Sequence, residues 1–384
     1  MDPQERRQLL SDCRTVVVKV GSRVLSQHDG HLDLDQVEHL ATQLCTLADG
    51  GKQVVLVSSG AVASGIAKLG LGERPRDLAR LQAVASVGQA HLIQAYEGHF
   101  SKRGRHVAQL LLVAGDLDDR ERYLNVRNTL TSLIDLGVIP IVNENDVVAV
   151  DELLTTFGDN DRLAAMVTGL FTKPALIILS DVDGLYDADP DLDASNVIPR
   201  VAQIDEQTLN LAGHSKSGVG KGGMASKVRA AQVVVQSGAA AIIAGGRVPN
   251  VLTRLMAGEE LGTIFLPQAR GLTPRKRWIG FSAQAAGSVV VDEGAANVLH
   301  SRGPSLLAIG IVDVSGEFHK GDVISIRSID GAEIAKGLSN YSAAELRLIK
   351  GLRSPKIADV LGHCPYEEVV HRDNMTVVAP GPHS

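Results

Sequence analysis

Short apolar segments alternate with helical segments through the first two thirds of the chain, and this alternation constrains the fold more than any other feature. The expected strands are apolar on both faces, as buried parallel strands are: Thr15–Val20, Gln53–Val57, His106–Leu112, Val138–Val142, Ala175–Leu179 and Ala240–Ala244. The helices expected between them are Leu34–Ala48, Ala61–Leu69, Leu78–Tyr96, Glu121–Leu136, Arg162–Phe171 and Ala225–Gln236. Successive β–α–β units predict an α/β fold, a three-layer αβα sandwich that binds ligands at the carboxyl ends of its strands.

The pattern changes at the Pro-, Gly- and Arg-containing segment LPQARGLTPRK, residues Leu266–Lys276. Beyond it, short apolar segments are separated by hairpin-type turns such as Asp330-Gly331. The expected strands are Ser288–Val291, Ala308–Val312, Val323–Arg327 and Glu333–Lys336, and the expected helices are Glu293–His300 and Ala343–Ile349. We therefore predict a large domain over residues 1–269 and a small, mostly β domain over residues 276–375.

Composition and charge exclude several classes of protein. Hydrophobic residues make up 44% and charged residues 21% of the 384 residues, as in a folded globular protein. The formal net charge of −6 lacks the basic character of a dedicated nucleic-acid binder. Cys13, Cys45 and Cys364 are too scattered for a disulfide framework or a zinc site. Because we find no signal-peptide pattern and no apolar run long enough for a membrane span, we expect a cytoplasmic protein.

Two polar motifs follow the first two expected strands. Lys19-Val20-Gly21-Ser22 ends the first strand, where a buried lysine needs an anionic partner and the backbone N–H groups suit a phosphate. On an edge strand, Lys19 would instead face solvent. Ser58-Ser59-Gly60-Ala61 lies between the second strand and a helix, a place that suits a carboxylate or a phosphate. The alternative for this motif is a plain serine cap of the helix.

Three more polar motifs lie at the ends of later elements. Asn143-Glu144-Asn145-Asp146 would bind an amino group, a carboxylate or a metal, unless it is a solvated Asx turn. In Phe157-Gly158-Asp159-Asn160-Asp161, one acid can cap the following helix, and the remaining polar groups suit a ligand. Ser180-Asp181-Val182-Asp183-Gly184-Leu185-Tyr186 follows the fifth strand and suits the nucleotide side of a site.

The segment Gly218–Lys227, GVGKGGMASK, is a glycine-rich loop ahead of a helix. It formally contains GxGxxG, but polar residues precede it instead of a strand, which argues against a dinucleotide site. It is no Walker A loop either, because Lys221 is followed by Gly222. We expect a flexible loop that places Lys221 and Lys227 over phosphates. The sequence contains no HExxH motif and no nucleophile elbow, so we expect neither covalent nor zinc-hydrolase chemistry.

Together these motifs resemble the amino acid kinase superfamily and, more closely, its glutamate 5-kinase family. The resemblance is carried by Lys19–Ser22, Ser58–Ala61, Asp116–Leu130, Asn143–Val150, Gly158–Asp161, Ser180–Tyr186 and Gly220–Lys227. The C-terminal part resembles the PUA domain of bacterial members at Lys276–Gly280, Val291–Ala295 and Val370–Met375, so nearly the whole chain is covered. One departure is Lys221, where the family loop often has threonine.

The resemblance implies phosphorylation of the γ-carboxylate of L-glutamate by ATP with Mg²⁺, the first step of proline biosynthesis, with proline as a feedback inhibitor. Lys19 and Lys227 would contact the transferring phosphoryl group, and Asp159 would orient both lysines. The other implied ATP contacts are Ser180, Asp181, Lys221, Gly222, Gly223, Met224, Ala225 and Ser226, and the implied glutamate contacts are Ser59, Asn143, Asp146, Asn160 and Asp161. The metal ligands stay unassigned. A homo-oligomer and a glutamyl-phosphate reductase partner are further expectations.

Other functions stay open at this point. Within the superfamily they are kinases for acetylglutamate, aspartate, carbamate or UMP, although the acetylglutamate and UMP enzymes normally lack the β-rich C-terminal part and aspartate kinases carry other regulatory domains. A different class is an RNA-binding protein that acts through the PUA-like domain. Its candidate basic patch, which we weigh against a solvated face, comprises Lys276, Arg277, Arg302, Lys320, Arg327, Lys336 and Arg347. A salt-dependent RNA complex would favour the binder, and glutamate-dependent ADP release would favour the enzyme.

Overall fold

The computed structural model describes residues 2–27, 30–148, 159–189, 195–213, 223–268, 273–302, 304–364 and 366–377. The chain divides into two compact units. The first consists of Met1–Leu117 and Glu121–Gly271, and the second consists of Asp118–Arg120 and Leu272–Ser384. Among the described helices, none combines the length and the apolar character that crossing a bilayer requires.

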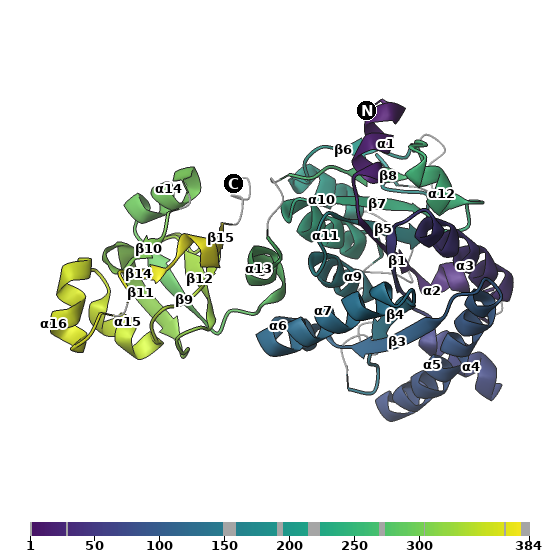
Figure 1. The fold of residues 1–384 in the computed structure, drawn as a ribbon, viewed down its shortest axis with the longest axis horizontal. Helices are drawn as coiled ribbons and strands as arrows, with labels where there is room; N and C mark the ends of the chain where they lie inside the picture. Colours follow the sequence, from purple (N-terminus) through teal and green to yellow (C-terminus); the bar gives the residue numbers. More distant parts are fainter. Residues whose placement is uncertain are drawn as a thin grey trace. The chain divides into compact units, whose positions relative to one another are not determined.

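The described strands of the first unit form an eight-stranded sheet with the order β3-β4-β2-β1-β5-β7-β8-β6 (Figure 1). Neighbouring strands are parallel except for the antiparallel pair β7–β8. The strands are β1 (Thr15–Val20), β2 (Gln53–Val57), β3 (Val107–Leu112), β4 (Ile139–Glu144), β5 (Pro174–Ser180), β6 (Arg200–Val201), β7 (Ala240–Gly245) and β8 (Thr263–Phe265). The central strand β1 is buried along its whole length, because it pairs with β2 and β5 and helices cover both of its faces.

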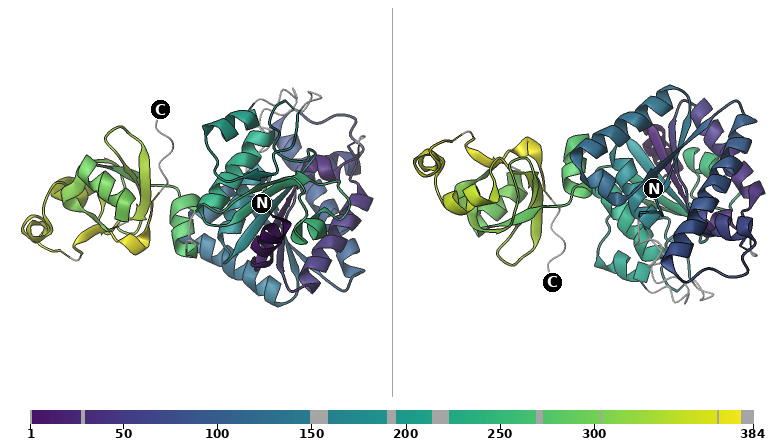
Figure 2. Two further views of the ribbon diagram at one scale, coloured as in Figure 1. Left: turned by 90° about the horizontal axis from the view of Figure 1, so that it is seen from above. Right: turned by 90° about the horizontal axis from the view of Figure 1, so that it is seen from below.

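Helices cover both faces of this sheet, as the views from above and below show (Figure 2). The described helices of the first unit are α1 (Pro3–Ser11), α2 (Ser22–Leu25), α3 (Leu34–Asp49), α4 (Ala61–Leu69), α5 (Leu78–Ser101), α6 (Ala114–Asp118), α7 (Arg120–Asp135), α9 (Asp159–Gly169), α10 (Glu206–Gly213), α11 (Gly223–Gln236) and α12 (Val251–Met256). On one face, α3, α5 and α12 contribute to a single apolar cluster with the strands. On the other face, α9 packs against β1 and β5, and α11 packs against α9 and β7.

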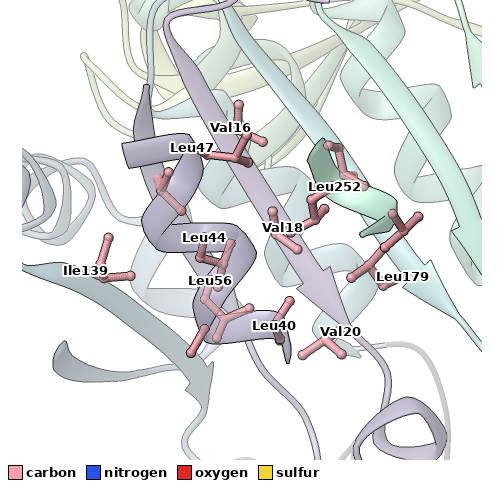
Figure 3. Packing of buried hydrophobic residues seen from close by; sticks show 14 of the residues in the cluster. Val16, Val18, Val20, Leu40, Leu44, Leu47, Leu56, Ile139, Leu179 and Leu252 are labelled. Atoms are coloured by element: carbon pink, nitrogen blue, oxygen red, sulfur yellow. The ribbon is translucent and has the colours of Figure 1, made fainter. Parts of the chain in front are cut away.

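Side chains along β1 point alternately to the two faces of the sheet, so neighbouring residues of β1 lie in different surroundings. Val16, Val18 and Val20 point into the apolar cluster with Leu40 and Leu44 of α3 (Figure 3). Lys19 lies between Val18 and Val20 and therefore points to the opposite face, where α9 lies. One buried strand thus supplies the core on one side and a lysine on the other.

The described strands of the second unit form a five-stranded sheet with the order β11-β9-β12-β13-β15 and a two-stranded sheet of β10 and β14. Its strands are β9 (Gly287–Val291), β10 (Leu306–Leu307), β11 (Ile311–Gly316), β12 (Val323–Arg327), β13 (Glu333–Leu338), β14 (Glu368–Val370) and β15 (Met375–Val377). Its α-helices are α13 (Pro274–Arg277), α14 (Glu293–Arg302), α15 (Ala343–Ile349) and α16 (Ile357–Leu361).

The predicted fold class is confirmed: an αβα sandwich is followed by a small, mostly β domain. The strand predicted over Ala308–Val312 is wrong in its first half. Residues Ala308–Gly310 form a 3₁₀ turn, and strand β11 begins only at Ile311. The turn is packed against α14, since a Cβ added at Gly310 would lie 2.7 Å from the Ala295 Cβ. Apolar composition alone does not distinguish such a buried turn from a strand.

Candidate active site

The carboxyl ends of β1 and β5 meet at the point where the chain changes direction across the sheet. From β1 the chain builds β2, β3 and β4 on one side, and β5 to β8 then lie on the other. The Gly21 N–H donates to the Leu179 carbonyl at 3.1 Å, which joins the two strand ends. In an open α/β sheet, a crevice at such a switch point is where ligands bind.

Two lysines contact one carboxylate on the face of the sheet that α9 and α11 cover. Lys19 Nζ lies 2.6 Å from Asp161 Oδ1, and Lys227 Nζ lies 3.3 Å from Asp161 Oδ2. The three side chains are 7%, 12% and 3% exposed for Lys19, Lys227 and Asp161. They come from β1, α11 and α9, so three elements distant in sequence build one buried cationic group. The anionic partner that a buried Lys19 requires is therefore Asp161.

Burial and charge act against each other in this lysine–aspartate triad, which consists of Lys19, Asp161 and Lys227. Burial raises the pKa of Asp161, but the two lysines outweigh it and hold that pKa below its usual value. Burial lowers the pKa of Lys227, and Asp161 counteracts this effect while the charge of Lys19 adds to it. With both lysines protonated, the triad carries a net positive charge in a place where little water can screen it.

The residues predicted for the nucleotide lie around the triad. Gly223, Met224, Ala225 and Ser226 form the first turn of α11, the positive end of a 14-residue helix. Lys227 Nζ also donates to the Gly223 carbonyl at 3.0 Å. The predicted contacts Lys221 and Gly222 lie outside the described residues.

At the end of β5, Ser180 is buried and its Oγ donates to Asp181 Oδ1 at 3.1 Å. Arg23 Nη1 lies 2.9 Å from Asp181 Oδ2. Burial raises the pKa of Asp181, but hydrogen bonds, that from Arg23 foremost, leave it below its usual value. The sequence analysis did not single out Arg23. Its position in α2, directly after Gly21 and Ser22, was the available signal.

The residues predicted for the acceptor substrate follow β2 and β4, two strands that are neighbours in the sheet. Ser59 and Gly60 lead into α4, and Gly60 adopts φ +100°, a left-handed conformation that favours glycine. Ser58 is buried, and its Oγ contacts the Tyr96 hydroxyl at 3.0 Å. Tyr96 belongs to α5 and was not singled out from the sequence.

Asn143 and Asp146 are both buried at the end of β4. Burial raises the pKa of Asp146, and this effect exceeds the opposing influence of a hydrogen bond from Gln89 and of the charge of Arg74. Gln89 and Arg74 were also missed in the sequence analysis, because neither lies in a motif. Asn160 is buried at the start of α9, one residue before Asp161.

One acid contacts both lysines of the triad. The resemblance assigns their orientation to Asp159, whose side chain lies outside the described residues. In the structure, Asp161 contacts both lysines, although the resemblance places it among the glutamate contacts. Asp161 is therefore the described acid that fixes their positions.

Several basic residues of the candidate RNA-binding patch in the second unit are buried or paired with other side chains. Arg277 is buried, and Arg347 Nη1 lies 2.8 Å from Glu317 Oε1. Lys320 Nζ lies over the ring of Tyr366, 4.5 Å from its centroid. These contacts do not favour a continuous cationic surface for RNA.

Among the residues that the structure describes, no three His, Cys, Asp or Glu side chains form a group that could hold a metal ion. Asp161 is already shared by two lysines, and Asp181 is paired with Arg23. The described side chains therefore do not form a dedicated Mg²⁺ site.

Known protein families and relatives match most of this chain. Residues 14–245 match the model of the amino acid kinase family, and residues 287–361 match that of the PUA domain. The chain is 50% identical to the glutamate 5-kinase of Rhodopirellula baltica, over 97% of this chain and 96% of that protein. It is 47% identical to the glutamate 5-kinase of Cupriavidus pinatubonensis, over 96% and 99% of the two chains.

Among solved structures, the chain is similar to a carbamate kinase from Giardia lamblia bound to AMP-PNP. The TM-score is 0.47 with 19% identity, over 67% of this chain and 100% of that chain. The family resemblance that the motifs predicted is confirmed by the matches along nearly the whole chain.

Proposed function

The chain belongs to the amino acid kinase family, and from this premise we propose that it transfers the terminal phosphoryl group of ATP to the γ-carboxylate of L-glutamate, as a glutamate 5-kinase does. The observation that carries the proposal is the buried lysine–aspartate triad at the switch point of the sheet. The 44–50% identity to glutamate 5-kinases over nearly the full chain supports glutamate as the acceptor.

The chemistry requires cations more than it requires a base. The γ-carboxylate of glutamate is ionised at neutral pH and attacks the phosphorus directly, so no side chain has to remove a proton. The phosphorus–oxygen bond to ADP breaks, and the bond to the carboxylate oxygen forms on the opposite side of the phosphoryl group. Lys19 and Lys227 would neutralise the equatorial oxygens in between, and Asp161 holds both ammonium groups in place beforehand.

ATP is the co-substrate, as the kinase family implies. We propose that its phosphates bind at the first turn of α11, where Gly223, Met224, Ala225 and Ser226 present backbone N–H groups. Ser180 and Asp181 would lie on the same side, and Lys221 and Gly222, which are outside the described residues, stay expected ATP contacts. Because the described residues do not form a metal site, we propose that Mg²⁺ enters as part of the ATP complex, bound by phosphate oxygens and water.

Glutamate would bind on the β2–β4 side. We propose that Asp146 receives the amino group and that Ser59, Asn143 and Asn160 receive the carboxylates. Asp146 suits this role because it is buried, so an ammonium group beside it would meet little screening by water.

A coupled assay of ADP release tests the reaction. Purified protein with Mg²⁺–ATP should release ADP in the presence of L-glutamate, and hydroxylamine should trap the acyl phosphate as a hydroxamate. L-Aspartate, N-acetyl-L-glutamate, carbamate and UMP serve as competing acceptors. If one of these supports faster turnover at equal concentration, or if ADP release does not depend on glutamate, the proposed substrate is wrong.

We also propose three properties that follow from the family. Proline would inhibit by competing with glutamate near Ser59 and Gly60 and near the segment 116–128. The protein would form a homo-oligomer, and a glutamyl-phosphate reductase would receive its labile product. Residues 1–269 would form the catalytic domain, and residues 276–375 the PUA domain.

A further inference from the structure

Three polar side chains lie at seven-residue spacing along helix α5. Gln82, Gln89 and Tyr96 are each two helical turns apart, so they share one face of α5. Gln82 Nε2 donates to the Val147 carbonyl at 2.9 Å, and Tyr96 contacts Ser58. The face thus reaches both strand ends that carry the proposed glutamate contacts.

Gln89 is the buried centre of this face, 7% exposed. Its Nε2 donates to Asp146 Oδ2 and to the Glu144 carbonyl, each at 3.3 Å. Its Oε1 accepts from Asn143 Nδ2 at 3.2 Å and from Gln109 Nε2 at 3.0 Å. A glutamine amide has two donors and two acceptor sites, so these contacts use its full capacity.

The four contacts permit only one orientation of the amide. Were the amide rotated by half a turn, its NH₂ group would face the NH₂ groups of Asn143 and Gln109, and its oxygen would face the Asp146 carboxylate. All four contacts would then be repulsive. Gln89 therefore joins Asn143 and Asp146, the two buried side chains at the end of β4, and Asn143 Oδ1 also accepts from the Glu144 N–H at 2.9 Å.

The helix that carries Gln89 is held tightly against α4. A Cβ added at Gly88 would lie 1.7 Å from the Ala61 carbonyl oxygen, and one added at Gly65 would lie 1.9 Å from the Val84 carbonyl oxygen. Only glycine allows this approach of the two backbones. Because α4 begins directly after Ser59 and Gly60, the contact ties the position of α5 to this proposed glutamate-binding segment.

We propose that Gln89 is a positioning residue of the glutamate site. Its amide holds the Asp146 carboxylate at one oxygen, so that the other oxygen can meet the amino group of the substrate, and it turns Asn143 toward the same space. The inference rests on the proposed function, since it takes Asp146 and Asn143 as glutamate contacts. Gln89 does not belong to the lysine–aspartate triad, so we expect its replacement to affect the binding of glutamate and not the transfer of the phosphoryl group.

The test compares Gln89→Met with Gln89→Glu. The methionine side chain has the same length as glutamine but lacks its donors and acceptors. The side chain introduced by Gln89→Glu keeps the acceptors and places a second negative charge beside Asp146. Loss of a hydrogen bond to a charged group predicts a rise in KM for glutamate of about 10- to 100-fold for Gln89→Met, and more for Gln89→Glu. KM for ATP should stay within about twofold, because the four hydrogen bonds of Gln89 join it to residues in and just after β4 and on β3, and none of these four leads to α11.

Gln82→Met is the matched control, because Gln82 lies on the same face of α5 but contacts only a backbone carbonyl at the surface. It should leave both KM values within about twofold of the wild type. Circular dichroism and glutamate binding measured by calorimetry without ATP separate a loss of binding from a loss of folding. If folded Gln89→Met keeps the wild-type KM for glutamate, or if KM for ATP rises equally, the positioning role is refuted. Absence of glutamate kinase activity in the wild type would instead refute the proposed function.

Discussion

Replacing Asp161 by Asn tests the electrostatic reasoning about the lysine–aspartate triad most directly. The change keeps the shape of the side chain but removes the negative charge that lies 2.6 Å from Lys19 and 3.3 Å from Lys227. Removing one member of a buried ion pair costs about 3–5 kcal/mol, because the remaining charge stays buried without its partner. We therefore expect Asp161→Asn to fold, with a free energy of unfolding of the first unit lower by about this amount.

The loss should be visible as a shift of about 1–3 M in the urea midpoint of the first unit. The single tryptophan, Trp278, lies in the second unit, so tryptophan fluorescence would not follow the unfolding of the first unit. Far-UV circular dichroism, which follows the helices of the first unit, is the suitable probe. Asp49→Asn is a matched control: Arg105 Nη2 lies 2.6 Å from Asp49 Oδ1, but the Asp49 side chain is 69% exposed. This exposed pair should contribute no more than about 1 kcal/mol.

The effect should also depend on pH with a defined sign. Folding lowers the pKa of Asp161 from its ordinary value of 3.8, so its contribution to stability is complete at neutral pH and is lost as the pH falls from that ordinary value through the lowered one. The difference between wild type and Asp161→Asn should therefore shrink in acid. Turnover at pH 7 should fall about 10²- to 10³-fold, because the ammonium groups lose their fixed positions. A variant with the wild-type urea midpoint and the wild-type kcat would refute this reasoning.

Three further predictions test the assignment of the sub-sites, the domain boundary and regulation. Lys19→Ala and Lys227→Ala should lower kcat by about 10²- to 10³-fold at saturating substrate, whereas Asp146→Ala and Asn160→Ala should mainly raise KM for glutamate and leave KM for ATP near normal. Near-normal kcat in the lysine variants would reverse or remove these assignments. A chain that ends near residue 269 should fold and keep glutamate kinase activity, and a folded but inactive product would refute the boundary. Proline should raise the apparent KM for glutamate without lowering kcat, and an unchanged rate at sub-saturating glutamate would remove that proposal.

Buried strands could be predicted from the sequence almost residue by residue. The predicted strands Thr15–Val20 and Gln53–Val57 coincide with β1 and β2, because a strand that is covered on both faces reads as an unbroken apolar run. The short strands β6 and β8 were missed, since a strand of two or three residues is too short to show such a pattern. Helix α5 was predicted to end at Tyr96 but continues to Ser101.

The sequence predicted individual residues of the site but not which of them contact one another. Lys19 and Lys227 could be found because a lysine in an apolar strand and a lysine beside a glycine-rich loop are both unusual. Which acid joins them depends on where α9 begins. The sequence predicted a start at Arg162, whereas the helix starts at Asp159 and carries Asp161 within its first turn. Since successive helical residues point about 100° apart, a shift of a few residues changes which acid faces the lysines.

The order of the strands has a consequence for the synthesis of the chain. β7 pairs with β5, but β6, α10 and α11 lie between the two strands in the sequence. Until residues Ala240–Gly245 leave the ribosome, the apolar strand β5 has a free edge that can pair with strands of other nascent chains. Translation that pauses before this point should therefore favour aggregation, and a chaperone that shields β5 should relieve it.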